Sequence, residues 1–143
     1  MLKGKLLMVF SALALGFTAC PAPQSYGLGG TITVPAGSDV KGTIIMACNI
    51  ENCKPQTQGN AKVVTIDTSG LTTQWNLVVF DPGKYQVIAV NTAQGLIGVY
   101  KNPKDNSSIV EIDGLDSKTD INISLQKGSV PAQALDLFAT STP

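Results

Sequence analysis

From residue 31 onward, apolar and polar side chains alternate along the chain, and turn residues interrupt the alternation at short intervals. A period of two places successive side chains on opposite faces of a β-strand. In the segment 73–80, for example, Trp75, Leu77 and Val79 share one face. The pattern predicts strands over residues 31–34, 40–47, 62–66, 73–80, 84–90, 96–100, 108–112 and 121–125.

These segments indicate one all-β domain. Strands joined by Gly-rich and Pro-rich turns, without helices to cross between parallel strands, are typical of an antiparallel two-sheet sandwich of roughly seven or eight strands. The segment 84–90 is apolar on both faces, which predicts a central strand. Residues 131–138 are the one stretch that could form a short helix, near the C-terminus. A chain of 143 residues has room for a single core of this kind.

The first nineteen residues have the composition of a secretory signal peptide. Lys3 and Lys5 precede an apolar run over 6–17, and small residues follow at 18–19. The run is shorter than the roughly 20 residues that a membrane-spanning helix needs. We therefore expect residues 1–19 to direct export and to be removed.

The sequence Phe17-Thr18-Ala19-Cys20 resembles the lipobox of bacterial lipoproteins, with Phe17 where that family usually has Leu. The resemblance implies that Cys20 is acylated and anchors the mature chain to a membrane of the cell envelope, on its periplasmic or outer face. The alternative is an ordinary secreted protein with a leftover thiol. Pro and Gly residues after Cys20 predict a flexible tether over 20–30, followed by the sandwich domain over 31–126 and a tail over 127–143.

Export changes the interpretation of the other two cysteines, Cys48 and Cys53. Outside the cytoplasm they most simply form a disulfide with each other. A zinc site needs about four ligands, and the chain has three cysteines and no histidine. A redox pair of the thioredoxin type has two intervening residues, whereas four intervene here. A bridge would hold the loop between the cysteines in place, which makes that loop a candidate for binding. The candidate binding residues are Asn49, Ile50, Glu51, Asn52 and Tyr100.

The segment 80–89, FDPGKYQVIA, resembles the hairpin of carboxypeptidase regulatory-like, or prealbumin-like, domains. Segments 30–34 and 121–125 resemble the opening and closing strands of those domains. The resemblance implies a prealbumin-like sandwich that serves as an accessory, adhesive or structural module without catalytic activity. Some bacterial relatives have an acidic calcium loop after the hairpin, but residues 91–95 contain no acidic side chain.

No catalytic constellation is evident. Without histidine a Ser-His-Asp or Cys-His arrangement is impossible, and Ser117 with Lys118 is the remaining nucleophile and base pair. Three aspartates could serve as paired carboxylates or calcium ligands, although Asp and Gly are equally typical of turns. They are Asp113, Asp116 and Asp120. We expect no enzyme activity, cofactor or metal.

The charged and aromatic residues limit the classes of partner that the sequence favours. Lysines and acidic residues balance at ten each and arginine is absent, so nothing favours nucleic acid. Trp75, Phe80 and Tyr85 are expected in the core, while Tyr100 is placed equally well in the core or on the surface. Two function classes remain: a non-enzymatic, lipid-anchored envelope protein whose sandwich contacts another envelope protein or a surface polymer, and a small-ligand or carbohydrate-binding lipoprotein.

Overall fold

A computed structural model describes residues 25–51, 61–114 and 117–128, and all regular structure in these ranges is β-strand. The expected signal peptide, Cys20, Cys53 and the segment 131–138 lie outside the described residues. The strands are β1 (Tyr26–Thr33), β2 (Ile44–Asn49), β3 (Ala61–Thr65), β4 (Thr72–Val79), β5 (Gly83–Asn91), β6 (Leu96–Val99), β7 (Ile109–Ile112), β8 (Ile123–Ser124) and β9 (Gln126–Lys127).

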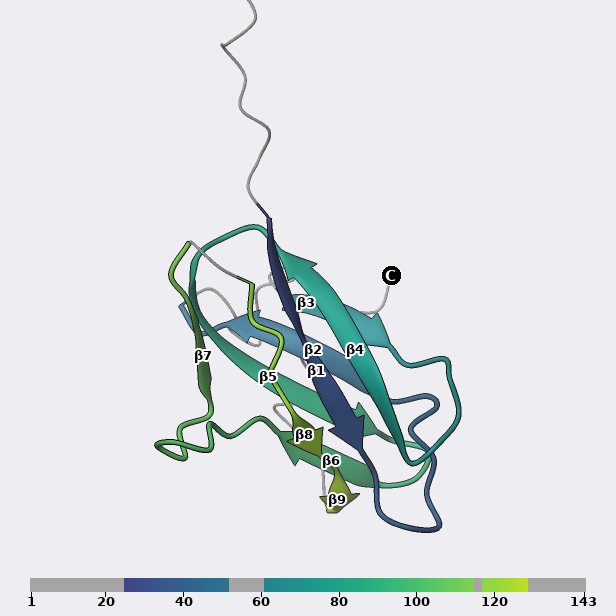
Figure 1. Ribbon diagram of the computed structural model, residues 1–143. Helices are drawn as coiled ribbons and strands as arrows, with labels where there is room; N and C mark the ends of the chain where they lie inside the picture. The colour runs from purple at the N-terminus through teal and green to yellow at the C-terminus, as the bar shows by residue number, and fades with distance from the viewer. Residues whose placement is uncertain (1–24, 52–60, 115–116, 129–143) are drawn as a thin grey trace, which may run out of the picture.

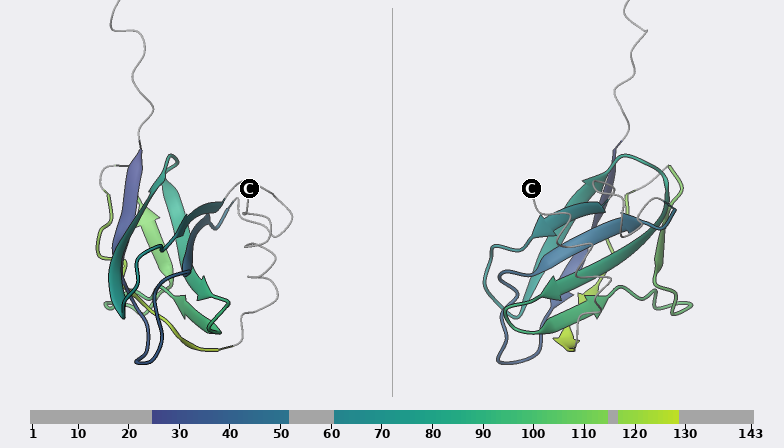
Figure 2. Two further views of the ribbon diagram at one scale, coloured as in Figure 1. Left: turned by 90° about the vertical axis from the view of Figure 1, so that its right-hand side faces the viewer. Right: turned by 180° about the vertical axis from the view of Figure 1, so that it is seen from behind.

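The strands form two sheets that lie face to face (Figures 1 and 2). The three-stranded sheet has the order β4-β1-β8. The six-stranded sheet has the order β3-β2-β5-β6-β9, and β7 also pairs with β5. All pairs are antiparallel except β1 and β8, which run parallel with Ile32 opposite Ile123. The predicted all-β, two-sheet sandwich is confirmed.

The core lies between the sheets and consists of the alternating residues that the pattern placed inside. Trp75, Leu77 and Val79 of β4 are all buried, as are Tyr85 and Val87 of β5. Strand β5 pairs with β2 along one edge and with β7 and then β6 along the other. Its central position explains why the sequence of this strand is apolar on both faces.

The predicted tether is too long at its C-terminal end, because β1 begins at Tyr26. Tyr26 is buried and pairs with Val79 of β4. The glycines that suggested flexibility lie where the backbone has close neighbours: a Cβ at Gly30 would overlap the carbonyl oxygen of Ile121. Residues 26–30 therefore belong to the sheet, and the prediction that they form a flexible tether is wrong.

Strand β2 begins at Ile44, four residues later than the apolar pattern predicts. The preceding residues form a turn in which the Thr43 amide donates to the Val40 carbonyl at 3.0 Å. Gly42 has φ +83°, a left-handed conformation that glycine adopts without strain. Val40 is therefore buried without pairing in a sheet, and its apolar side chain misled the prediction of where the strand begins.

Candidate functional site

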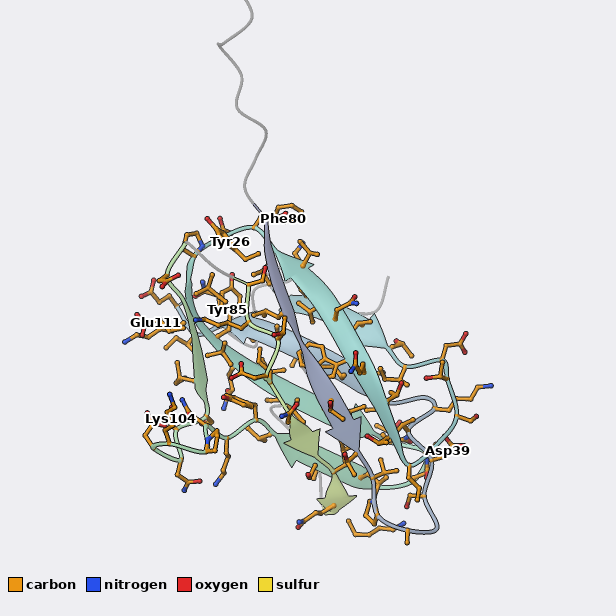
Figure 3. The ribbon with its side chains drawn as sticks, viewed as in Figure 1. Tyr26, Asp39, Phe80, Tyr85, Lys104 and Glu111 are labelled. Atoms are coloured by element: carbon orange, nitrogen blue, oxygen red, sulfur yellow. The ribbon has the colours of Figure 1, made fainter. Side chains whose placement is uncertain are left out.

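A hollow of about 570 Å³ opens on one flank of the sandwich, and we call it the flank hollow. Strand β7, the loop before it and the segment 118–121 surround the hollow, and Figure 3 shows Lys104 and Glu111 on this side. Its volume is within the range typical of binding sites for small molecules or short peptide segments. The lining residues are Ile50, Lys84, Tyr100, Asn102, Pro103, Lys104, Asp105, Ser107, Ile109, Val110, Glu111, Lys118, Asp120 and Ile121.

Elements held to both sheets contribute to the lining of the hollow. Strand β7 pairs with the first half of β5, and no other strand in the described part of the chain pairs with β7. On the opposite side, the segment 118–121 is held to β1 of the other sheet. The Gly29 amide donates to the Lys118 carbonyl at 2.8 Å, and the Ile121 amide donates to the Gly29 carbonyl at 3.0 Å. An edge strand and a fixed segment thus face each other across the hollow.

The loop 102–107 forms one rim and is closed by its own hydrogen bonds. The Asn102 amide donates to the Ser107 carbonyl at 2.7 Å, and the Asn102 side-chain oxygen accepts from the Lys104 amide at 2.9 Å. Asp105 accepts in the same way from the Ser107 amide at 2.9 Å. A loop fixed in this way loses little conformational entropy when a partner binds.

Tyr100 lies at the hollow but shows little of its surface, since only 7% of the residue is exposed. Its amide donates to the Val87 carbonyl at 3.0 Å. Burial raises the pKa of the Tyr100 hydroxyl, and the nearby carboxylates of Asp120 and Asp105 raise it further. The phenol therefore stays protonated at neutral pH and offers a hydroxyl group, while its ring has no open face on which a sugar could stack.

The lining is polar and carries both signs of charge. Three lysines and three acidic residues line the hollow, together with apolar residues that include Ile109 and Ile121. A surface of this kind suits a partner that itself has both charges and an apolar portion, as a polypeptide segment has. The charged lining residues are Lys84, Lys104, Lys118, Asp105, Glu111 and Asp120.

The structure places some of the predicted binding residues at the flank hollow and others away from it. Ile50 is 45% exposed and lines the flank hollow together with Tyr100, and its amide donates to the Lys84 carbonyl at 3.0 Å. Asn49 is buried, and its side-chain oxygen accepts from the Glu51 amide at 3.0 Å, so Asn49 shapes the turn. Glu51 is exposed outside the lining of the hollow.

Asn52 and Cys53 lie outside the described residues. Cys48 is buried at the end of β2. The pairing of Cys48 with Cys53 stays a prediction.

The lysines and aspartates of the hollow were not selected from the sequence as a binding set. They come from three segments, around residue 84, over 102–111 and over 118–120, and only the sheet topology brings these together. The available signal was local: the Asn-Pro and Asp-Asn-Ser turn residues of 102–107 predict a structured loop. Asp113 does not line the hollow, Asp120 does, and Asp116 lies outside the described residues.

Ser117 and Lys118, the candidate nucleophile and base, both form hydrogen bonds to the backbone of Gly27. The Ser117 hydroxyl oxygen accepts from the Gly27 amide at 2.9 Å, and the Lys118 amide donates to the Gly27 carbonyl at 2.9 Å. These bonds attach the segment to β1. Neither contact gives the serine the activated geometry of a nucleophile.

Of the three aromatic residues predicted to lie in the core, two are buried. Trp75 and Tyr85 are buried; the Trp75 indole donates to the Ile121 carbonyl at 3.3 Å and the Tyr85 hydroxyl to the Asp81 carbonyl at 2.7 Å. Phe80 is 52% exposed, so its assignment to the core is wrong. It follows Val79, which faces inward, and strand alternation points it to the opposite side.

Comparison with known proteins gives no family: no family model, no curated protein and no solved structure matches this chain. Within the described ranges, no three His, Cys, Asp or Glu residues are grouped closely enough to hold a metal ion. The same ranges contain no helix of the length and apolarity needed to cross a membrane. The sandwich and its flank hollow are therefore the basis for a functional assignment.

Proposed function

We propose that this chain is a non-enzymatic, lipid-anchored protein of the bacterial cell envelope whose β-sandwich binds a polypeptide segment of another envelope protein in the flank hollow. The observation that carries the proposal is the edge of β7, which opens onto a preformed hollow of about 570 Å³. An extended segment can add to such an edge through main-chain hydrogen bonds, while neighbouring side chains provide specificity.

The lining supports a peptide partner. Ile50 and Ile109 provide apolar contact, and charges of both signs line the walls. Binding by edge addition also satisfies backbone groups that an unpaired edge strand leaves exposed. The lipid at Cys20, and the prealbumin-like character that the hairpin 80–89 suggests, belong to the same proposal and place such a module at a membrane surface.

A second candidate function is the binding of a small solute in the same hollow. The volume of the hollow favours it, and the mixed charges would suit a zwitterionic ligand. A carbohydrate is the weaker version of this candidate, because Tyr100 and Trp75 are both buried and present no stacking face.

Site-specific photocrosslinking in the native envelope tests the proposal. A photoreactive amino acid at position 104, on the rim of the hollow, is expected to capture a discrete protein. The control carries the same group at position 41, also an exposed lysine in a turn, beside Asp39 on the opposite side of the molecule (Figure 3). Capture of one protein from position 104 and not from position 41 supports the peptide-binding module. If neither position gives a protein adduct, and a small solute bound to the purified chain protects position 104 from labelling, the second candidate replaces the first.

A further inference from the structure

An exposed apolar patch lies at the end of the sandwich where the chain enters β1. Phe80 and Val78 face the same side of β4 and are 52% and 49% exposed. Val79, between them, pairs with Tyr26, the first residue of β1. Figure 3 shows Phe80 beside Tyr26 at this end.

A lysine completes the patch. The Lys62 ammonium of β3 lies 5.6 Å from the centroid of the Phe80 ring, within the range of a cation–π contact. Lysine side chains of this kind keep the charge in water or among head groups while the stem covers apolar surface. We call Lys62, Val78 and Phe80 the tip patch.

The short stretch of chain between Cys20 and β1 limits how far the tip patch can lie from a membrane in which Cys20 is anchored. Because β1 begins at Tyr26, five residues lie between it and Cys20. The six residue steps from Cys20 to Tyr26 span at most about 20–22 Å even when fully extended. Strand β4 alone is about 26 Å long, so a lipid on Cys20 holds the tip of the sandwich closer to the membrane than the sandwich is long.

We propose that the tip patch contacts the lipid bilayer, with the Phe80 ring and the Val78 side chain in the interfacial region between head groups and acyl chains. This inference rests on the proposed lipidation of Cys20. An aromatic ring beside an aliphatic side chain and a lysine is the composition that favours an interfacial position. A short tether supplies a high effective concentration, so a small patch suffices for a contact that is populated most of the time.

The charge at this end favours a contact that does not require anionic lipid. Two lysines, Lys62 and Lys84, are matched here by two acidic residues. Asp81 follows Phe80 in the chain, and Glu51 follows Ile50, whose amide donates to the Lys84 carbonyl. The proposal therefore differs from polybasic attraction to acidic head groups. Contact is expected on vesicles of pure phosphatidylcholine.

Fluorescence quenching by brominated acyl chains tests the contact. The lipidated chain, purified from its own membranes, is reconstituted in phosphatidylcholine vesicles as the Phe80→Trp variant and as the Leu71→Trp variant. Leu71 is the matched control, because it is 50% exposed and lies at the opposite end of β4, near Asp39. Wild type gives the contribution of the buried Trp75.

The expected result is a loss of emission and a blue shift for Phe80→Trp on brominated vesicles, with Leu71→Trp no more quenched than wild type. Vesicle-bound protein whose Phe80→Trp emission is unquenched, or quenched no more than Leu71→Trp, overturns the membrane contact and leaves the proposed function standing. A chain that lacks a lipid on Cys20 by mass spectrometry overturns both. A concentration-dependent blue shift of Phe80→Trp in the unlipidated Cys20→Ala protein without vesicles overturns the inference in favour of a second copy of this chain.

Discussion

Gly30 lies where the backbone of β1 passes directly against the backbone at Ile121. The approach is so close that a Cβ atom would overlap the Ile121 carbonyl group. The same carbonyl accepts a hydrogen bond from the Trp75 indole at 3.3 Å. A single missing side chain therefore allows a strand, a crossing segment and a buried ring to meet at one point.

Replacing Gly30 by alanine is expected to lower the free energy of unfolding by about 1–3 kcal/mol, the usual cost of forcing an extra carbon into a packed site. The measurement is urea unfolding followed by Trp75 fluorescence. Thr31→Ala, at the neighbouring partly exposed position, is the control and should change stability by no more than about 0.5 kcal/mol. Equal stability of the two variants would show that the backbone at Ile121 moves away without cost.

At the scale of elements, Asp39 joins the turns at the end of the sandwich opposite the tip patch. Its carboxylate accepts from the Lys41 amide at 2.8 Å and the Gly70 amide at 3.1 Å. Its main chain exchanges two bonds with the Gln94 side chain, at 2.9 and 2.7 Å. The turns after β1, before β4 and after β5 are thus held together around one residue.

These bonds make stability depend on pH. The hydrogen bonds from the Lys41 and Gly70 amides lower the pKa of Asp39 below its ordinary value of 3.8, although burial opposes them. A carboxyl whose pKa is lower in the folded state stabilises the fold above the unfolded pKa, and this contribution is lost as pH falls through the folded pKa. We expect the free energy of unfolding to drop more steeply in wild type than in Asp39→Asn as pH falls below the ordinary carboxyl pKa of 3.8. Thermal unfolding across this range is the measurement, with exposed Asp67→Asn as control for the loss of one surface charge; parallel curves for Asp39→Asn and wild type would contradict the argument.

At the scale of the whole molecule, the proposed lipid anchor would hold the sandwich at the end where β1 begins, and the flank hollow reaches that end at Ile50 and Lys84. Cys20 precedes β1 at one end, while the hollow lies along the side between β7 and the segment 118–121. A lipid on Cys20 would hold the tip, and the rim of the hollow around Lys104 would lie away from the membrane (Figure 3). In the proposed arrangement, anchoring and peptide binding would therefore be possible at the same time.

From the proposed lipidation of Cys20, replacing this residue by alanine is expected to release the protein from membranes, because the acyl chains would supply most of the attachment and the tip patch alone is too small to retain it. Fractionation of cells into membrane and soluble parts is the measurement. Ser25→Ala, at an exposed position just before β1, is the control and should stay in the membrane fraction. Continued membrane fractionation of the Cys20→Ala protein would contradict a lipid anchor at this residue.

The sequence predicted the parts of the fold that depend on local alternation. In β4 and β5 the buried faces, including Trp75 and Val87, follow directly from the period of two. The start of β1 could not be found in this way, because Gly27, Gly29 and Gly30 indicate flexibility unless their distant neighbours are known. Phe80 was misplaced although the alternation itself points it outward. Of the candidate binding residues, Ile50 and Tyr100 meet at the hollow, but its charged lining comes from segments that carry no shared local signal.

Strand β1 also has a consequence for the way in which the chain acquires its structure. It is the first of the described strands, yet it pairs with β4 and, through the parallel pair of Ile32 and Ile123, with β8, the second-last of them. Contacts between residues so far apart in sequence are slow to form. The three-stranded sheet cannot close until the segment around Ile123 is available, so during synthesis the N-terminal strand stays without its full set of partners. We expect a chain with this order of pairing to fold late and as one unit, once the segment around Ile123 has been synthesised.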